Sequence, residues 1–221
     1  MTSGLVTAVC VSGPDLLAVP DRRPNRSGID ERPVEGRVAV HPLGLDGDVQ
    51  LKDPPAPHRS QARGGPLQGG RDADWWAAEL DRELPAGRFG ENLRTTGLDL
   101  TGAVLGEWWR VGTALIESKD PPAPHCSHAR SGSLQEGRKR FTARGASGAY
   151  LRVLETGDLG AGDAVEVVSR PDHGVTVGLL FRATTTHKSR LPEIAPALDH
   201  LPLKDRPRLA ARIEQRRTPR S

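Results

Sequence analysis

The sequence predicts a mainly β fold, either a barrel or a sandwich, accompanied by a few short helices. Gly (25) and Pro (19) together make up about a fifth of the 221 residues, which is typical of short strands joined by turns. Short apolar segments rich in Val, Leu, Ile, Trp and Thr also alternate with Gly or Asp along much of the chain. Strands at such spacing are usual in barrels and sandwiches.

Six stretches are expected to contain strands because apolar and β-branched residues in them are bounded by Gly, Pro or Asp. They are residues 4–12, 36–50, 92–100, 103–118, 149–170 and 174–183. The Asp46-Gly47 pair in the second stretch predicts a tight turn.

One helix is predicted before residue 90. Residues 72–84 (DADWWAAELDREL) begin with aspartates that can cap a helix, and Pro85 ends it. Trp75, Trp76 and Leu80 lie on overlapping helix faces, so we expect this side of the helix to pack on the sheet.

The C-terminal part is expected to be helical and basic. Residues 1–172 should form the β domain, and residues 173–221 an extension with two or three short helices broken at its prolines. Residues 182–221 carry 10 Lys and Arg against 4 Asp and Glu. Because this segment lacks aromatic residues that could stack on bases, we interpret it as a solvated helix face and do not expect nucleic-acid binding. The alternative is a tail that contacts nucleic acid, anionic ligands or a partner.

The compartment expected from the sequence is the cytoplasm. No run of 18 apolar residues exists, so no membrane span is expected, and the N-terminus lacks the pattern of a secretory signal. The chain has two cysteines, too few for a disulfide framework. Cys10 lies within an apolar strand and is interpreted as a buried small hydrophobe.

A repeated segment interrupts this pattern. Residues 52–71 (KDPPAPHRSQARGGPLQGGR) recur as residues 119–138 (KDPPAPHCSHARSGSLQEGR). Nothing around them repeats, which excludes a solenoid. Both copies are poor in apolar residues and rich in Pro, Gly, Arg and His, so we predict that both are loops and that neither contributes a core strand.

The segment 89–117 (FGENLRTTGLDLTGAVLGEWWRVGTALIE) resembles the central signature of MOSC domains, the family named after the C-terminal part of molybdenum-cofactor sulfurases. Residues 32–50 and 140–177 look like the family's first and closing strands. The tail is similar to the extension of its hydroxylaminopurine-resistance branch. The resemblance implies a MOSC-type β-barrel with a few short helices and a small C-terminal helical tail, and binding of the molybdenum cofactor (molybdopterin).

Cys126 is the residue where the resemblance implies chemistry, both as the catalytic residue and as the metal ligand. A thiolate is a soft ligand that suits molybdenum or a transferable sulfur, and the neighbouring His125, His128 and Arg130 favour the thiolate. The family's Gln-Pro-Arg-x-Pro-Cys pattern is altered here to the residues 120–126 (DPPAPHC), with one residue added. The alternative is an ordinary loop cysteine.

The candidate cofactor-binding residues offer hydrogen-bond donors, acceptors or close backbone approach. They are Arg37, Arg63, Gly64, Gly65, Glu91, Asn92, Arg140, Tyr150 and Arg152. Arg63 stands where the family has His. The alternatives are a turn role for Asn92 and ordinary surface positions for Arg37 and Arg140. Strand alternation places Tyr150 and Arg152 on one face, which lines either a cavity or solvent.

Three functions remain open. The resemblance implies a molybdenum-dependent oxidoreductase that reduces N-hydroxylated bases or amines with electrons from a separate flavin or iron–sulfur reductase. A second possibility is a sulfur carrier that holds a persulfide on Cys126. The sulfur would come from a cysteine desulfurase, a pyridoxal-phosphate-dependent enzyme, which is the link to pyridoxal phosphate binding. The third is a binding protein whose altered loops have impaired catalysis.

Overall fold

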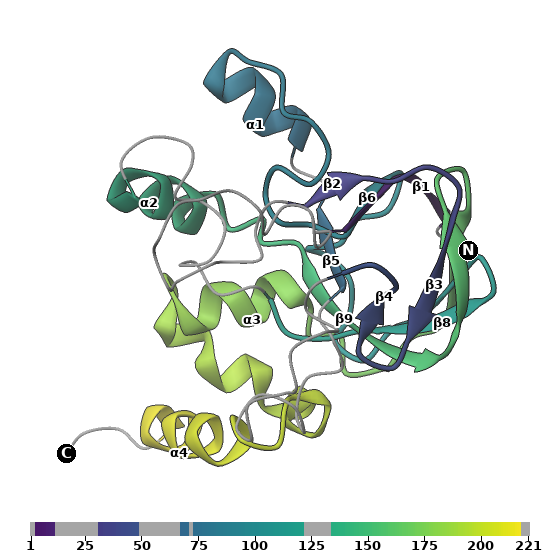
Figure 1. Ribbon diagram of the computed structural model, residues 1–221. Helices are drawn as coiled ribbons and strands as arrows, with labels where there is room; N and C mark the ends of the chain where they lie inside the picture. The colour runs from purple at the N-terminus through teal and green to yellow at the C-terminus, as the bar shows by residue number, and fades with distance from the viewer. Residues whose placement is uncertain (1–2, 12–30, 49–66, 71–72, 122–133, 218–221) are drawn as a thin grey trace, which may run out of the picture.

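The protein is built around a ring of paired strands, as a computed structural model shows (Figure 1). The structure describes residues 3–11, 31–48, 67–70, 73–121 and 134–217, and backbone only for residues 67–70 and 134–138. Within this part of the chain, strands pair in the order β11, β7, β8, β9, β5, β6 and β1, and β1 pairs again with β11 to close the ring. The β5–β6 pair is parallel and the other pairs are antiparallel. The predicted mainly β, barrel-like fold is therefore confirmed.

The strands of the ring are short and come from both halves of the chain. Their bounds are β1 Ser3–Val11, β5 Leu67–Gly70, β6 Leu93–Thr96, β7 Trp108–Val111, β8 Ala114–Ser118, β9 Ala149–Glu155 and β11 Ala164–Ser169. A two-residue strand, β2 (Arg32–Pro33), extends the sheet beside β1. A second sheet has the order β10 (Gly157–Gly160), β3 (Arg37–His41) and β4 (Gly44–Leu45).

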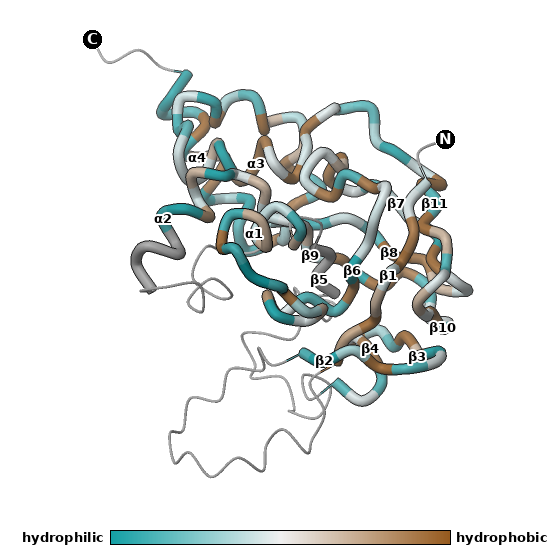
Figure 2. Tube along the Cα trace, turned by 90° about the horizontal axis from the view of Figure 1, so that it is seen from above, coloured by the Kyte–Doolittle hydropathy of each residue, from teal (hydrophilic) through white to brown (hydrophobic). Residues whose placement is uncertain are grey.

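The main hydrophobic core lies inside the ring, where alternate side chains of the strands meet. Trp109, Ile116 and Leu151, from three adjacent strands, are each at most 2% exposed. Figure 2 shows hydrophobic residues along these strands. Burial of this apolar surface is the main free-energy gain that closes the ring.

The described helices gather on one side of the barrel (Figure 1). They are α1 (Ala73–Leu80), α2 (Leu134–Arg144), α3 (Val177–Thr184), the 3-10 helix η3 (Lys188–His200) and α4 (Arg206–Arg217). No helix in the described part of the chain combines the length and the apolar character that crossing a membrane requires.

The predicted helix at 72–84 is confirmed as α1, but its packing partner is not the sheet. Trp76 is 2% exposed and joins a separate hydrophobic cluster with Phe141 of α2 and Phe181 of α3. Trp75 is 37% exposed and contacts Trp76 edge-on. Helix α1 therefore packs against other helices through Phe141 and Phe181, and Phe89 in the connection to β6 adds a tilted ring contact with Trp76.

The strand predicted within residues 174–183 is wrong, because these residues form most of α3. The hydroxyl of Thr176 accepts a hydrogen bond from the backbone N–H of Leu179 (3.1 Å) and caps the helix. Val177, Leu180 and Phe181 then lie on one buried side of the helix. Their three- and four-residue spacing is helical, and the Thr-based cap decides between the two interpretations of a short apolar segment.

The prediction that both copies of the repeat are loops is also wrong. The Leu-Gln-x-Gly part of the first copy forms β5, while the corresponding residues of the second copy begin α2. Strand β5 fills the gap between β9 and β6: Gly69 pairs with Ala149 on one side and with Leu93 on the other. Unpaired backbone groups at that gap can be satisfied by a strand of almost any composition, so tertiary context overrides local preference.

The C-terminal helices share the core of the barrel. Leu180 of α3, Ile194 of η3 and Ile213 of α4 belong to the same buried cluster as the strand residues. Pro192 was expected to break a helix but lies inside η3. Pro207 is the second residue of α4, where a missing backbone N–H costs little.

Candidate functional site

The predicted site residues fall into two groups. Cys126, Arg63, Gly64 and Gly65 lie outside the described residues. The other six lie at four places on the fold: at the end of β8, beside β1, in the second sheet and on α2.

The segment that contains Cys126 leaves the barrel from the end of β8. Beyond the last residue of this strand, the backbone N–H of Lys119 donates to the carbonyl of Tyr150 (2.8 Å), and the N–H of Tyr150 donates to the carbonyl of Asp120 (3.0 Å). These bonds extend the pairing with β9 up to residue 120. The chain is therefore held on the barrel to within a few residues of Cys126.

A charged cluster, the Glu117 cluster, lies at this strand end and consists of Glu117, Lys119 and Arg152. Residue 117 lies directly opposite residue 152 in the β8–β9 register, and the Glu117 side chain is 6% exposed. An Nη of Arg152 lies 2.5 Å from one carboxylate oxygen of Glu117, and Nζ of Lys119 lies 3.6 Å from the other. Two cations thus surround one buried carboxylate, which leaves one net positive charge.

Lys119 lies on the side of this cluster that faces η3, and its side chain is largely buried. Its ammonium donates to the carbonyl of His200 at the end of η3 (2.7 Å). Burial lowers the pKa of Lys119, and the negative charge of Glu117 opposes the shift. Arg152 is about half exposed, so it is the member of the cluster that solvent and a ligand can reach.

Two side chains hold the backbone at residues 199–201, a segment named here the 199–201 turn. Arg206 at the start of α4 donates to the carbonyls of Asp199 (2.5 Å) and Leu201 (2.8 Å), while Lys119 bonds the carbonyl between them. Helix α4 is therefore connected through this turn to the strand end that leads to Cys126.

Glu91 and Asn92 lie at the start of β6, where both are buried. The side-chain N–H₂ of Asn92 donates to the carbonyl of Cys10 (3.1 Å) and to a carboxylate oxygen of Asp48 (2.9 Å). These bonds join β6, β1 and the segment after β4. In this structure Asn92 therefore connects three parts of the protein.

Glu91 is held by an unusually complete set of donors. It accepts from the backbone N–H groups of Gly87 (3.0 Å) and Phe89 (2.9 Å) and from two guanidinium nitrogens of Arg94 (2.7 and 3.2 Å). Arg94 also donates to the carbonyls of Leu84 (2.8 Å) and residue 85 (3.0 Å). The Glu91–Arg94 pair thus fixes the connection between α1 and β6.

Cys10 is fully buried next to this pair, as the sequence predicts. Burial, reinforced by the negative charge of Glu91, raises the pKa of its thiol to about 12. Cys10 is therefore protonated at neutral pH and is a poor nucleophile.

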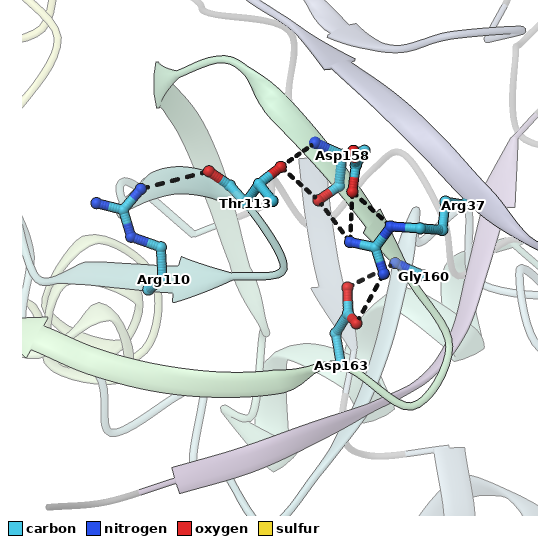
Figure 3. A network of polar contacts seen from close by, with 6 residues as sticks. All are labelled: Arg37, Arg110, Thr113, Asp158, Gly160 and Asp163. Atoms are coloured by element: carbon cyan, nitrogen blue, oxygen red, sulfur yellow. Dashed lines mark hydrogen bonds and ion pairs between the residues drawn. The ribbon is translucent and has the colours of Figure 1, made fainter.

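Arg37 takes part in a network that joins the two sheets (Figure 3). Its guanidinium donates to the carboxylates of Asp158 (2.5 Å) and Asp163 (3.0 Å) and to the carbonyl of Asp158 (3.1 Å). Gly112 has φ +56°, and a Cβ atom there would overlap the Asp158 carbonyl oxygen. Protein carboxylates thus already occupy the guanidinium that was predicted to bind the cofactor, which favours a structural role for Arg37.

Arg140 occupies a similar structural position on α2. It pairs with Glu79 of α1, and its guanidinium lies 5.8 Å from the centre of the Trp76 ring. One turn further along, the guanidinium of Arg144 lies 4.4 Å from the Trp75 ring. These cation–π contacts hold α1 against α2.

Comparison with known proteins finds a family similarity in the central part of the chain. The model of the MOSC domain matches residues 70–166, a range that includes Glu91, Asn92 and Cys126. Residues 70–166 of this chain are similar to the MOSC domain, which confirms the resemblance found in the sequence.

The chain also has relatives along most of its length. The chain is 26% identical to the uncharacterized protein YflK of Bacillus subtilis over 84% of this chain and 83% of YflK. It is 28% identical to the protein YiiM of Escherichia coli over 70% and 69% of the two chains. A protein of Gibberella moniliformis named reductase is 30% identical over 43% of this chain, but the match covers 18% of that protein.

The fold agrees with a solved structure. The crystal structure of YiiM from Geobacillus stearothermophilus superposes with a TM-score of 0.74 at 22% identity and covers 95% of this chain and 99% of YiiM. At this identity the likeness concerns the fold.

Within residues 70–166, the structure brings together Tyr150 and Arg152 next to Glu117 and Lys119. Arg37 and Arg140 lie elsewhere. Glu117 and Lys119 were not predicted as site residues. The available signal was Glu117 itself, a carboxylate inside the apolar run 114–118, because a fully buried charge needs a partner.

Proposed function

We propose that this MOSC protein binds the molybdenum cofactor and reduces N-hydroxylated bases or amines with electrons from an external donor. The observation that carries the proposal is the Glu117 cluster at the strand end from which the Cys126 segment departs. The name of the fungal relative, a reductase, supports the reaction class.

The chemistry of the Glu117 cluster fits an anionic cofactor. Its two cations exceed its one carboxylate, and Arg152 is accessible, so a phosphate near this strand end would find a guanidinium with bidentate geometry. Glu117 orients Arg152 through their ion pair, and Lys119 holds the backbone of the strand end against η3. Cys126 would supply a soft sulfur ligand.

The reaction requires two electrons and two protons: the N–O bond breaks, the amine forms and water leaves. The cofactor, when bound, supplies the two-electron redox chemistry. The chain has two cysteines in total, fewer than the four that ligate most iron–sulfur clusters, so we expect the electrons to come from a separate flavin or iron–sulfur protein.

Metal and pterin analysis of protein purified from a host that makes the cofactor tests the proposal. We expect molybdenum and pterin in wild type and a lower content of both in Cys126→Ser, because the variant lacks one metal ligand. Cys10→Ala is the matched control, because it removes the other thiol without touching the proposed ligand. A wild-type protein that contains neither molybdenum nor pterin would rule the proposal out.

Mass spectrometry separates this function from sulfur transfer. If molybdenum is absent and Cys126 gains roughly 32 Da, one sulfur atom, after incubation with a cysteine desulfurase and cysteine, the chain is a sulfur carrier. If neither assay distinguishes Cys126→Ser from wild type, the binding protein with impaired catalysis is the remaining explanation.

A further inference from the structure

One flank of α4, beside its buried side, carries a row of arginines, of which Arg208 and Arg216 are exposed and Arg212 is half-buried. Among its 12 residues (RPRLAARIEQRR) are five arginines and one glutamate. Leu209 and Ile213 point into the core. Arg208, Arg212 and Arg216 follow at four-residue intervals and form a ridge about 12 Å long. Figure 2 shows α4 mainly in hydrophilic colours.

This arginine ridge (Arg208, Arg212 and Arg216) is only weakly neutralised by the protein. Arg208 lies 3.7 Å from Asp205, and Arg208 is 71% exposed. Among the described residues, no carboxylate pairs with Arg212 or Arg216. Arg206 of the same helix differs from the ridge, because its guanidinium donates to two backbone carbonyls of the 199–201 turn.

We infer that the arginine ridge docks a small acidic electron-carrier protein. The inference rests on the proposed function, which needs an external donor. Complementary charge steers a transient partner and speeds its association without a large apolar interface. The ridge has no aromatic residue to stack on bases, which favours an acidic protein over a single-stranded nucleic acid.

The position of α4 supports this role. Arg206 holds the 199–201 turn from α4, and Lys119 holds the same turn from the end of β8. A partner on α4 would therefore bind a helix that is fixed to the strand end leading to Cys126.

Titration calorimetry with full-length protein tests the inference, with a plant-type [2Fe–2S] ferredoxin as the acidic probe. We expect saturable binding that weakens as salt is raised and that is about ten-fold weaker in Arg212→Glu/Arg216→Glu. The control Lys139→Glu/Lys188→Glu changes the net charge equally at exposed lysines outside α4, and we expect it to bind like wild type. Equal weakening in the control, no saturable binding, or tighter binding of a duplex DNA than of ferredoxin would overturn the inference.

Turnover driven by reduced methyl viologen separates this inference from the proposed function, because a small reductant needs no docking surface. We expect the α4 variant to lose ferredoxin-driven reduction and to keep viologen-driven reduction. Loss of both rates, with the control normal, would contradict docking. If wild type shows no viologen-driven reduction but binds ferredoxin through Arg212 and Arg216, the docking surface stands and the proposed reaction falls.

Discussion

Replacing Arg94 by Met should be among the most destabilising single changes outside the hydrophobic core. Arg94 is the only described side chain that donates to Glu91, whose side chain is 1% exposed. The change leaves that carboxylate with two backbone donors and deprives two carbonyls of their partner. Breaking a buried ion pair on one side costs about 3–5 kcal/mol, which corresponds to a fall in Tm of roughly 10 °C for a domain of this size.

The protein contains a matched control for this prediction. Arg190 and Glu193 form a pair with the same residue types and the same three-residue separation, but both side chains are more than 40% exposed. Arg190→Met should therefore leave Tm nearly unchanged, because solvent already screens an exposed pair.

Urea unfolding and thermal melting compare the stability of Arg94→Met and Arg190→Met with that of wild type. Adding Glu91→Gln to Arg94→Met should recover part of the lost stability, because it removes the unpaired charge. If Arg94→Met is no more harmful than Arg190→Met, the structural role assigned to the Glu91–Arg94 pair is incorrect.

Three further outcomes follow from single side chains. Gly112→Ala should cost about 1–3 kcal/mol in urea unfolding, because residue 112 has φ +56° and lies against the Asp158 carbonyl; an unchanged midpoint would contradict this packing. Burial lowers the pKa of Lys119, so the unfolded chain binds the proton more tightly and wild-type stability should rise as pH increases toward the ordinary lysine value of about 10.4; Lys119→Met should reduce that slope, and an identical slope would exclude the shift. In a Cys126→Ser protein, Cys10 should resist alkylation at pH 8 until the chain unfolds, because burial raises its thiol pKa to about 12; rapid alkylation of the native protein would disprove its burial.

The strands of the barrel could be predicted because turn residues and core periodicity agree there. In residues 103–118, Gly112 separates two runs whose alternate residues Trp109 and Ile116 enter the core. Hydrophobic alternation and turn chemistry are both local signals, so they can be identified without tertiary contacts.

The two copies of the repeat show where local reasoning ends. Leu67-Gln68 is in a strand and Leu134-Gln135 is in a helix, although the surrounding residues are nearly the same. The difference comes from β9 and β6, which offer unpaired backbone groups to the first copy. Such groups are contributed by distant parts of the chain, and no property of the segment reveals them.

Residues of the candidate site could be predicted where they belong to a sequence motif. The role of an arginine could not be predicted where it depends on the carboxylate with which the arginine pairs. Arg37 and Arg152 were both candidate cofactor-binding arginines in the sequence. In the structure, Arg37 is committed to Asp158 and Asp163, whereas Arg152 shares Glu117 with Lys119 and stays accessible. Their partners are more than thirty residues away along the chain, so the distinction needs the fold.

X-ray absorption at the molybdenum edge is the most direct test of the claim that Cys126 ligates the metal. The spectra of cofactor-loaded wild type and of Cys126→Ser reconstituted with the same cofactor should differ by one sulfur scatterer, which is present in wild type and absent in the variant. Identical sulfur coordination in the two proteins would show that Cys126 is not the ligand.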